Sequence, residues 1–104
     1  MDTVEKDGLI IGSVIKSRVG RDRKRVFIVV GVTEVSGEMR LLVTDGRLRR
    51  ADKPKMKNPR HVRLIGRLSD EEMTCLQCAD DESIRRMLLS HDSYYSDEYA
   101  GKNI

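Results

Sequence analysis

The side chains of this chain that are most able to do chemistry are cations, and they fall into two sets. The first set surrounds a glycine between two apolar runs, and its members are Arg18, Gly20, Arg21, Arg23, Lys24 and Arg25. The second set lies further along the chain, and its members are Arg47, Arg49, Arg50, Lys53, Lys55, Lys57 and Arg60. Guanidinium groups donate paired hydrogen bonds to phosphate oxygens, and ammonium groups attract phosphates as point charges. Both sets therefore indicate a surface that binds phosphate groups.

Charge is distributed unevenly along the sequence. Residues 16–67 contain sixteen Lys and Arg against five Asp and Glu, a net charge of +11. Residues 68–104 contain three Lys and Arg against nine Asp and Glu, a net charge of −6. A dense basic segment threaded through apolar runs is typical of proteins that bind nucleic acid. The alternative is a basic surface that serves only solubility.

Two cysteines and two histidines are the other candidates for chemistry. A structural zinc site needs four ligands, and the pair Cys75 and Cys78 has no second pair to join it. A redox CxxC motif requires a βαβ context that the neighbouring sequence does not offer. Neither His61 nor His91 lies near a nucleophile pattern. We therefore expect no catalytic residue, no metal, no cofactor and no small-molecule substrate, and we interpret the cysteines as reduced core or incidental thiols.

Short apolar runs must position these cations. Alternating or continuous apolar residues predict strands over residues 9–16, 25–35, 39–44, 47–51 and 60–66. In the second strand Val26, Ile28, Val30 and Val32 alternate with Phe27 and Val29, which predicts burial on both faces. Five short antiparallel strands in fewer than about sixty residues predict a mainly β fold, a small SH3-like barrel.

Turn residues separate these runs. Gly12 predicts a bulge or a close approach, and Ser36-Gly37 predicts a hairpin turn. Asp45-Gly46 predicts a second tight hairpin, which would lead into a short basic strand with Leu48 as its anchor. Because Pro54 and Pro59 cannot donate to a sheet, residues 53–59 are predicted to form a basic loop.

The spacing of apolar residues changes at Leu68 from that of a strand to that of a helix, and a short helical tail is predicted from there. Ser69 to Glu72 has the pattern of a capping box, with Leu68 and Met73 as a hydrophobic staple, and the first helix should end near Cys78. Residues 80–83 open a second helix whose apolar face carries Ile84, Met87 and Leu88. We therefore divide the chain into a flexible N-terminus (1–8), a barrel (9–67) and an acidic, helical and partly disordered tail (68–104), with disorder from Ser90 onward. The apolar faces of the barrel should be complete without the tail, whose acids either cap helices or compete with nucleic acid for the basic face.

Aromatic residues are scarce. The chain has one Phe, no Trp and three Tyr, and the tyrosines all lie in residues 94–99. Proteins that bind single strands usually stack bases on aromatic side chains, so recognition here should depend on phosphates and shape. An SH3-like protein-interaction module that recruits an acidic partner is the alternative, although a peptide groove of that kind needs aromatic residues.

Two segments together resemble a known family. The run Gly12 to Ser17, followed by Gly20 to Val26, resembles the KOW motif, which is a strand, a basic glycine-containing turn and a second strand. Residues 41–50, followed by KPKMKNPRHVRL at 53–64, are similar to a bacterial KOW-domain RNA-binding family. That family is in turn similar to the KOW barrel of certain archaeal and eukaryotic large-subunit ribosomal proteins. The usual KOW turn has a further glycine near Lys24 and Arg25, which this chain lacks.

The resemblance covers residues 9–67 and implies a function. It implies an SH3-like barrel that binds structured RNA, such as ribosomal RNA in translation, with Gly20 as the turn glycine and both basic sets as phosphate contacts. The chain starts with an acidic segment, its first apolar run is too short for a secretory signal, and no run approaches the length of a membrane span. We expect a cytoplasmic protein that is associated with the ribosome, is a monomer when free and does not contact membranes.

Overall fold

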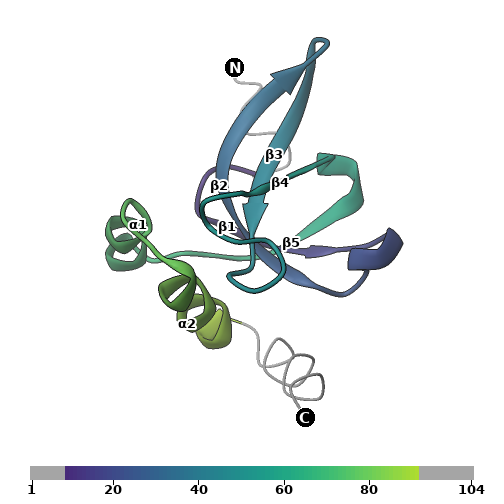
Figure 1. Ribbon diagram of the computed structural model, residues 1–104. Coiled ribbons are helices and arrows are strands. Elements are labelled where there is room, and N and C mark those ends of the chain that lie inside the picture. Colours follow the sequence, from purple (N-terminus) through teal and green to yellow (C-terminus); the bar gives the residue numbers. More distant parts are fainter. Residues whose placement is uncertain (1–8, 92–104) are drawn as a thin grey trace.

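Alternating apolar residues form five antiparallel strands in the computed structural model, which describes residues 9–91 (Figure 1). The strands are β1 (Ser13–Ser17), β2 (Val26–Val35), β3 (Glu38–Thr44), β4 (Lys55–Lys57) and β5 (Val62–Arg67). They form one sheet in the order β4-β3-β2-β1-β5, so β5 returns to pair with β1 as in a small barrel. Short 3-10 turns, η2 (Gly20–Asp22) and η3 (Pro59–His61), precede β2 and β5, and the helices α1 (Asp70–Leu76) and α2 (Asp81–His91) follow. The predicted mainly β fold with a helical C-terminal part is confirmed.

Strand β2 is buried on both faces, as predicted. Ile28 packs in one apolar cluster, and Phe27 and Val29 pack in another on the opposite face. The register of β2 against β3 shifts between Val29 and Gly31, and such a bulge moves every later side chain to the other face. Val32 therefore joins the face of Phe27, and its predicted place beside Val26 and Ile28 is wrong.

The hairpin of β2 and β3 extends beyond the rest of the sheet (Figure 1). Ser36 and Gly37 both have positive φ, 53° and 81°, as a two-residue turn of type I′ requires. This predicted turn is confirmed. On β3, Thr44 is fully buried, and its hydroxyl donates a hydrogen bond to the carbonyl of Arg49.

The second predicted hairpin and its strand over 47–51 are wrong. The Asp45 carboxylate accepts hydrogen bonds from the backbone N–H groups of Arg47 and Arg49, and this closes a loop instead of a strand pair. The fourth strand is β4, inside the segment predicted as a loop, and it pairs with β3 from Leu41 to Val43. Its three residues lie between Pro54 and Pro59 at the edge of the sheet, where proline is tolerated.

Both helices begin as the sequence predicts. The Ser69 hydroxyl accepts from the N–H of Glu72, and the Glu72 carboxylate accepts from the N–H of Ser69, which makes a capping box. Leu68 and Met73, the predicted staple, lie in the same apolar cluster. Gly12 has a φ of 93°, and a Cβ there would collide with the Met73 sulfur, so the predicted close approach is confirmed.

The helices complete the core. Ile84 and Leu88 of α2 are fully buried in the cluster that contains Val14, Val26 and Ile28 of the sheet. The expectation that the apolar faces of the barrel are complete without the tail is therefore wrong. The opposite face of the sheet carries its own cluster, which comprises Leu9, Ile15, Phe27, Val29, Leu41, Val43 and Val62.

The C-terminal helix is longer than predicted. Ser90 and His91 belong to α2, so disorder does not begin at Ser90. The predicted flexible N-terminus (1–8) and the rest of the predicted disorder (92–104) lie outside the described residues. Within residues 9–91, neither helix has the length and apolar character that crossing a membrane requires.

Candidate nucleic-acid interface

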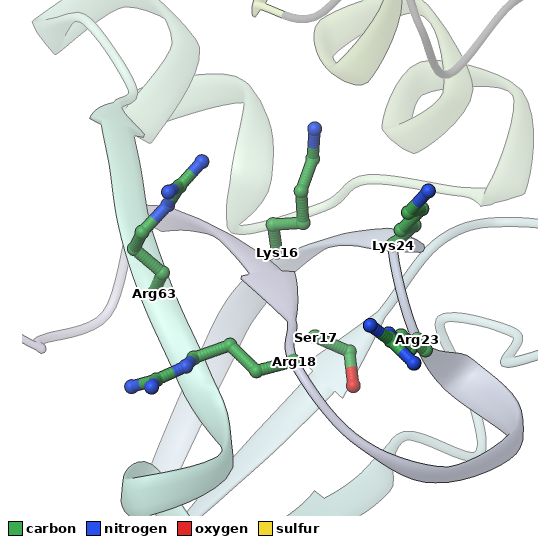
Figure 2. A pocket seen from close by; sticks show the side chains of 6 residues that line it. All are labelled: Lys16, Ser17, Arg18, Arg23, Lys24 and Arg63. Carbon is green, nitrogen blue, oxygen red and sulfur yellow. The ribbon is translucent and has the colours of Figure 1, made fainter.

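Five cations from two strands and one loop surround an open concavity of about 440 Å³. They are Lys16 of β1, Arg63 of β5, and Arg18, Arg23 and Lys24 of the β1–β2 loop, and we call them the cation cradle. Ser17 also lines the concavity, and no acidic residue does so among those whose side chains the structure describes. Figure 2 shows Lys16 and Arg63, on their strands, and Lys24, in the loop, extending in the same direction.

The pairing of β1 with β5 brings two of these cations together. Lys16 lies directly opposite Arg63 in the antiparallel register. Directly opposite residues of an antiparallel pair lie close together, so these two strands place two positive charges side by side. The cross-strand pair is therefore suited to an anionic ligand.

Backbone hydrogen bonds fix the β1–β2 loop beside these strands. Lys24 N–H donates to the carbonyl of Ser17 at 2.8 Å, and Ser17 N–H donates to the carbonyl of Arg25 at 2.9 Å. Arg18 N–H donates to the carbonyl of His61 at 2.8 Å, which ties the start of the loop to the approach to β5. The loop cations are thus held near Arg63 by the fold rather than by a flexible tether.

Left-handed backbone occurs at two positions of this loop. Gly20 and Lys24 both have a φ of 72°. Glycine adopts this conformation without steric strain, whereas a lysine does so at some cost. Lys24 thus has a backbone conformation that favours glycine.

The first basic set divides between the cradle and its surroundings. Arg18, Arg23 and Lys24 line the concavity, whereas Gly20 and Arg21 are exposed in η2 outside the lining. Arg25, also predicted as a phosphate contact, is only 9% exposed. It directly precedes β2, and its carbonyl accepts the N–H of Ser17.

The second basic set does not join the first, since none of its members lines the concavity. Arg49, Arg50, Lys53 and Arg60 are exposed, whereas Arg47 and Lys55 are half-buried. Lys57 is buried, with its Nζ 5.8 Å from the centre of the Phe27 ring, so its stem packs against the core. Arg50 Nε lies 3.3 Å from Asp81 Oδ2 and 3.6 Å from Asp52 Oδ1.

The sequence did not identify Lys16 and Arg63 as site residues. The sequence did place both residues on predicted strands, since Arg63 alternates with Val62 and Leu64, and Lys16 ends the first apolar run. What was missing is their proximity, because nearly fifty residues separate them and only the β1–β5 pairing brings them together.

The cysteines, the histidines and the aromatic residue lie outside the cation cradle. Cys75 and Cys78 are free, exposed thiols, so the core packing that was one of the two interpretations is wrong. His61 is exposed, and His91 Nε2 lies 2.9 Å from Glu72 Oε1, which joins the two helices. Within residues 9–91, no group of three side chains is arranged to hold a metal ion. Phe27, the only aromatic residue in that range, is fully buried and therefore offers no stacking surface.

No protein-family model matches the sequence, and a search of curated proteins finds no significant match.

Proposed function

We propose that this protein binds structured RNA, in particular ribosomal RNA, through the cation cradle of a KOW-type barrel, and that it acts at the ribosome. The observation that carries the proposal is the convergence of five cations from two strands and one loop on one concavity. Phosphate neutralisation dominates the affinity of proteins for nucleic acids. The resemblance of residues 9–67 to KOW domains supports RNA as the nucleic acid.

The side chains of the cation cradle are suited to recognise RNA through its phosphate groups. Arg18, Arg23 and Arg63 supply planar guanidinium groups that match phosphate oxygens, and the two lysines add point charge. Because Phe27 is buried, the described surface has no aromatic platform on which to stack successive bases. A folded RNA, whose phosphates are held in fixed positions, suits such a cradle better than an extended single strand.

Salt dependence is the first test. The neutralisation of about four to six phosphates gives a log–log slope of affinity against salt of roughly −3 to −5. Fluorescence anisotropy with a labelled RNA hairpin, measured at several salt concentrations, would provide this slope. A slope near zero would contradict the proposal.

Matched charge variants locate the site. Arg23→Gln/Arg63→Gln removes two exposed cations of the cradle, and Arg67→Gln/Arg86→Gln removes two exposed cations outside it. We expect the cradle variant to weaken binding strongly and to reduce the salt slope by about two, because each missing cation leaves one phosphate without its neutralising partner. The control variant should change both values much less. Equal effects of the two variants would mean that net charge alone attracts RNA, without a site.

A further inference from the structure

The loop of residues 45–51, which we call the finger loop, presents an apolar side chain among arginines. Leu48 is 60% exposed, the highest value among the large apolar residues of the described chain. Arg47, Arg49 and Arg50 are its neighbours in sequence. Leu48 was predicted to anchor a strand, but the residue instead projects from a loop.

The interior of the protein holds this loop on one side. Asp45 is fully buried, and its Oδ1 accepts the N–H of Arg47 and the N–H of Arg49, both at 2.9 Å. The carbonyl of Arg49 accepts the N–H groups of Asp45 and Gly46 at 3.0 and 3.2 Å. The backbone on both sides of Leu48 is therefore fixed.

Helix α2 holds the loop on the other side. Asp81 Oδ1 accepts the N–H of Ala51 at 2.7 Å, and Arg85 Nη1 donates to the carbonyl of Gly46 at 2.6 Å. A Cβ on Gly46 would lie 2.6 Å from the carbonyl oxygen of Asp81, so helix and loop are in backbone contact. Asp81 and Arg85 thus form hydrogen bonds with the two ends of the loop that carries Leu48.

We infer that the finger loop is a second contact with RNA, in which Leu48 packs against an unstacked base while the exposed Arg49 and Arg50 contact phosphates. This inference rests on the proposed function and specifies its ligand as a folded RNA with a bulged or unpaired base. Apolar side chains that enter base steps are a known means of recognition, and Leu48 would supply the base contact that the buried Phe27 does not. Because the loop is already ordered, binding costs little conformational entropy.

Asp81 and Arg85 become positioning residues for RNA binding. This positioning role and a competition between the acidic tail and RNA predict opposite changes in RNA affinity when the Asp81 carboxylate is removed. If α2 merely competed with RNA for cations, removal of the Asp81 charge would tighten binding. If Asp81 positions the finger loop, its removal weakens binding to an RNA with an unpaired base.

The first experiment compares Leu48→Ala with Leu89→Ala, a second exposed leucine on the outer side of α2. The probes are an RNA hairpin with one bulged adenosine and the same hairpin fully paired. We expect Leu48→Ala to weaken binding to the bulged probe roughly five-fold, because less apolar area is removed from water on binding, and to leave the paired probe unchanged. Leu89→Ala should affect neither probe.

The outcomes separate this inference from the proposed function. Unchanged binding with Leu48→Ala, or equal weakening on both probes, overturns the base contact, while the cradle stands if Arg23→Gln/Arg63→Gln still weakens both. If the cradle variant also binds as well as the wild type, the proposed function fails. Leu48-dependent binding to vesicles of phosphatidylglycerol, with RNA binding unchanged, would assign the finger loop to a membrane surface instead.

The second experiment uses charge-matched pairs on α2. Asp81→Ala and Glu82→Ala each remove one negative charge, and Arg85→Gln and Arg86→Gln each remove one positive charge. Asp81→Ala also removes the oxygen that accepts the Ala51 N–H. Glu82 and Arg86, the control positions, are exposed and contact each other at 3.6 Å. Asp81→Ala and Arg85→Gln should each lower the affinity ratio of bulged to paired probe several-fold, whereas the controls should leave this ratio unchanged. A ratio unchanged by Asp81→Ala would overturn the positioning role.

Discussion

At the scale of single residues, the backbone conformation of Lys24 conflicts with the identity of its side chain. Its φ of 72° favours glycine, yet its side chain is one of the five cations of the cradle. A non-glycine residue in this conformation is less stable by about 1 kcal/mol or more. The lysine thus keeps a charge at the site at the expense of the stability of the turn.

Replacement of Lys24 separates the two effects. Lys24→Gly should raise the free energy of unfolding by about 1 kcal/mol, because it relieves the strain, and should weaken RNA binding as much as Lys24→Gln does. Urea unfolding and anisotropy titrations measure the two quantities. Lys53→Gly is the control, since Lys53 does not have positive φ and should gain no stability. Equal stabilities of Lys24→Gly and Lys24→Gln would contradict this account.

Glu72 serves both helices with one carboxylate. Its Oε1 accepts the N–H of Ser69 and lies 2.9 Å from His91 Nε2. Burial alone would raise the pKa of Glu72, but the hydrogen bonds from His91 and Ser69 outweigh it, and the pKa lies below its ordinary value of 4.5. A carboxyl whose pKa is lowered by folding stabilises the native state above its unfolded pKa, and this stability is lost as the pH falls through the folded pKa.

Acid should therefore weaken the junction of α1 and α2. We expect the free energy of unfolding of the wild type to fall as the pH decreases below about 4.5, and to fall less in Glu72→Gln, which does not titrate. Urea denaturation at a series of pH values provides the comparison. Glu71→Gln, which alters the exposed neighbouring carboxylate, should retain the wild-type pH dependence. A parallel decline in Glu72→Gln would exclude this role for the carboxylate.

At the scale of elements, α2 has an inner and an outer face with different tasks. Ile84 and Leu88 are fully buried against the sheet, whereas Leu89 is 42% exposed. The first two turns of the same helix contact the finger loop through Asp81 and Arg85. The helix therefore completes the core and orders a basic loop at the same time.

Two adjacent leucines test the structural task. Leu88→Ala should lower the free energy of unfolding by about 2–4 kcal/mol, because it leaves a cavity between α2 and the sheet. Leu89→Ala should change it by less than about 0.5 kcal/mol. Chemical denaturation of both variants measures the difference. Similar values for the two would mean that α2 does not pack as described.

At the scale of the whole molecule, the basic and acidic regions share one folded unit. The acids after Leu68 cap helices and fasten the finger loop, as Glu72 and Asp81 show. The helices lie together on one side of the sheet (Figure 1). The apolar cluster between them and the sheet belongs to both regions, so neither buries it alone.

A shortened protein that ends at Arg67 tests whether the sheet needs the helices in order to fold. Without Leu68, Ile84, Met87 and Leu88, the side chains of Val14, Val26 and Ile28 are exposed to water. We expect this shortened protein to lack the cooperative thermal transition of the full chain in far-ultraviolet circular dichroism. A transition at the same temperature as in the full chain would show that the barrel is complete without α1 and α2.

Local patterns determined much of this protein from the sequence alone. The β2–β3 hairpin, the two-sided burial of β2 and the capping box of α1 each depend on residues close together in the chain, so their signals survive without tertiary context. The same holds for the basic turn around Gly20. These features account for the correct fold class and for three of the five cradle cations.

The tertiary structure decided what depends on distant partners. The Asp45 carboxylate converts a predicted hairpin into the finger loop because Asp81 and Arg85, more than thirty residues away, hold that loop in place. Lys16 and Arg63 meet only because β5 returns to pair with β1. Pairing between strands that are distant in the sequence depends on the packing free energy of the whole core. The residues next to a given position in the sequence reveal little of that free energy. The sequence alone could therefore indicate a basic, strand-rich protein, but not which of its cations share one concavity.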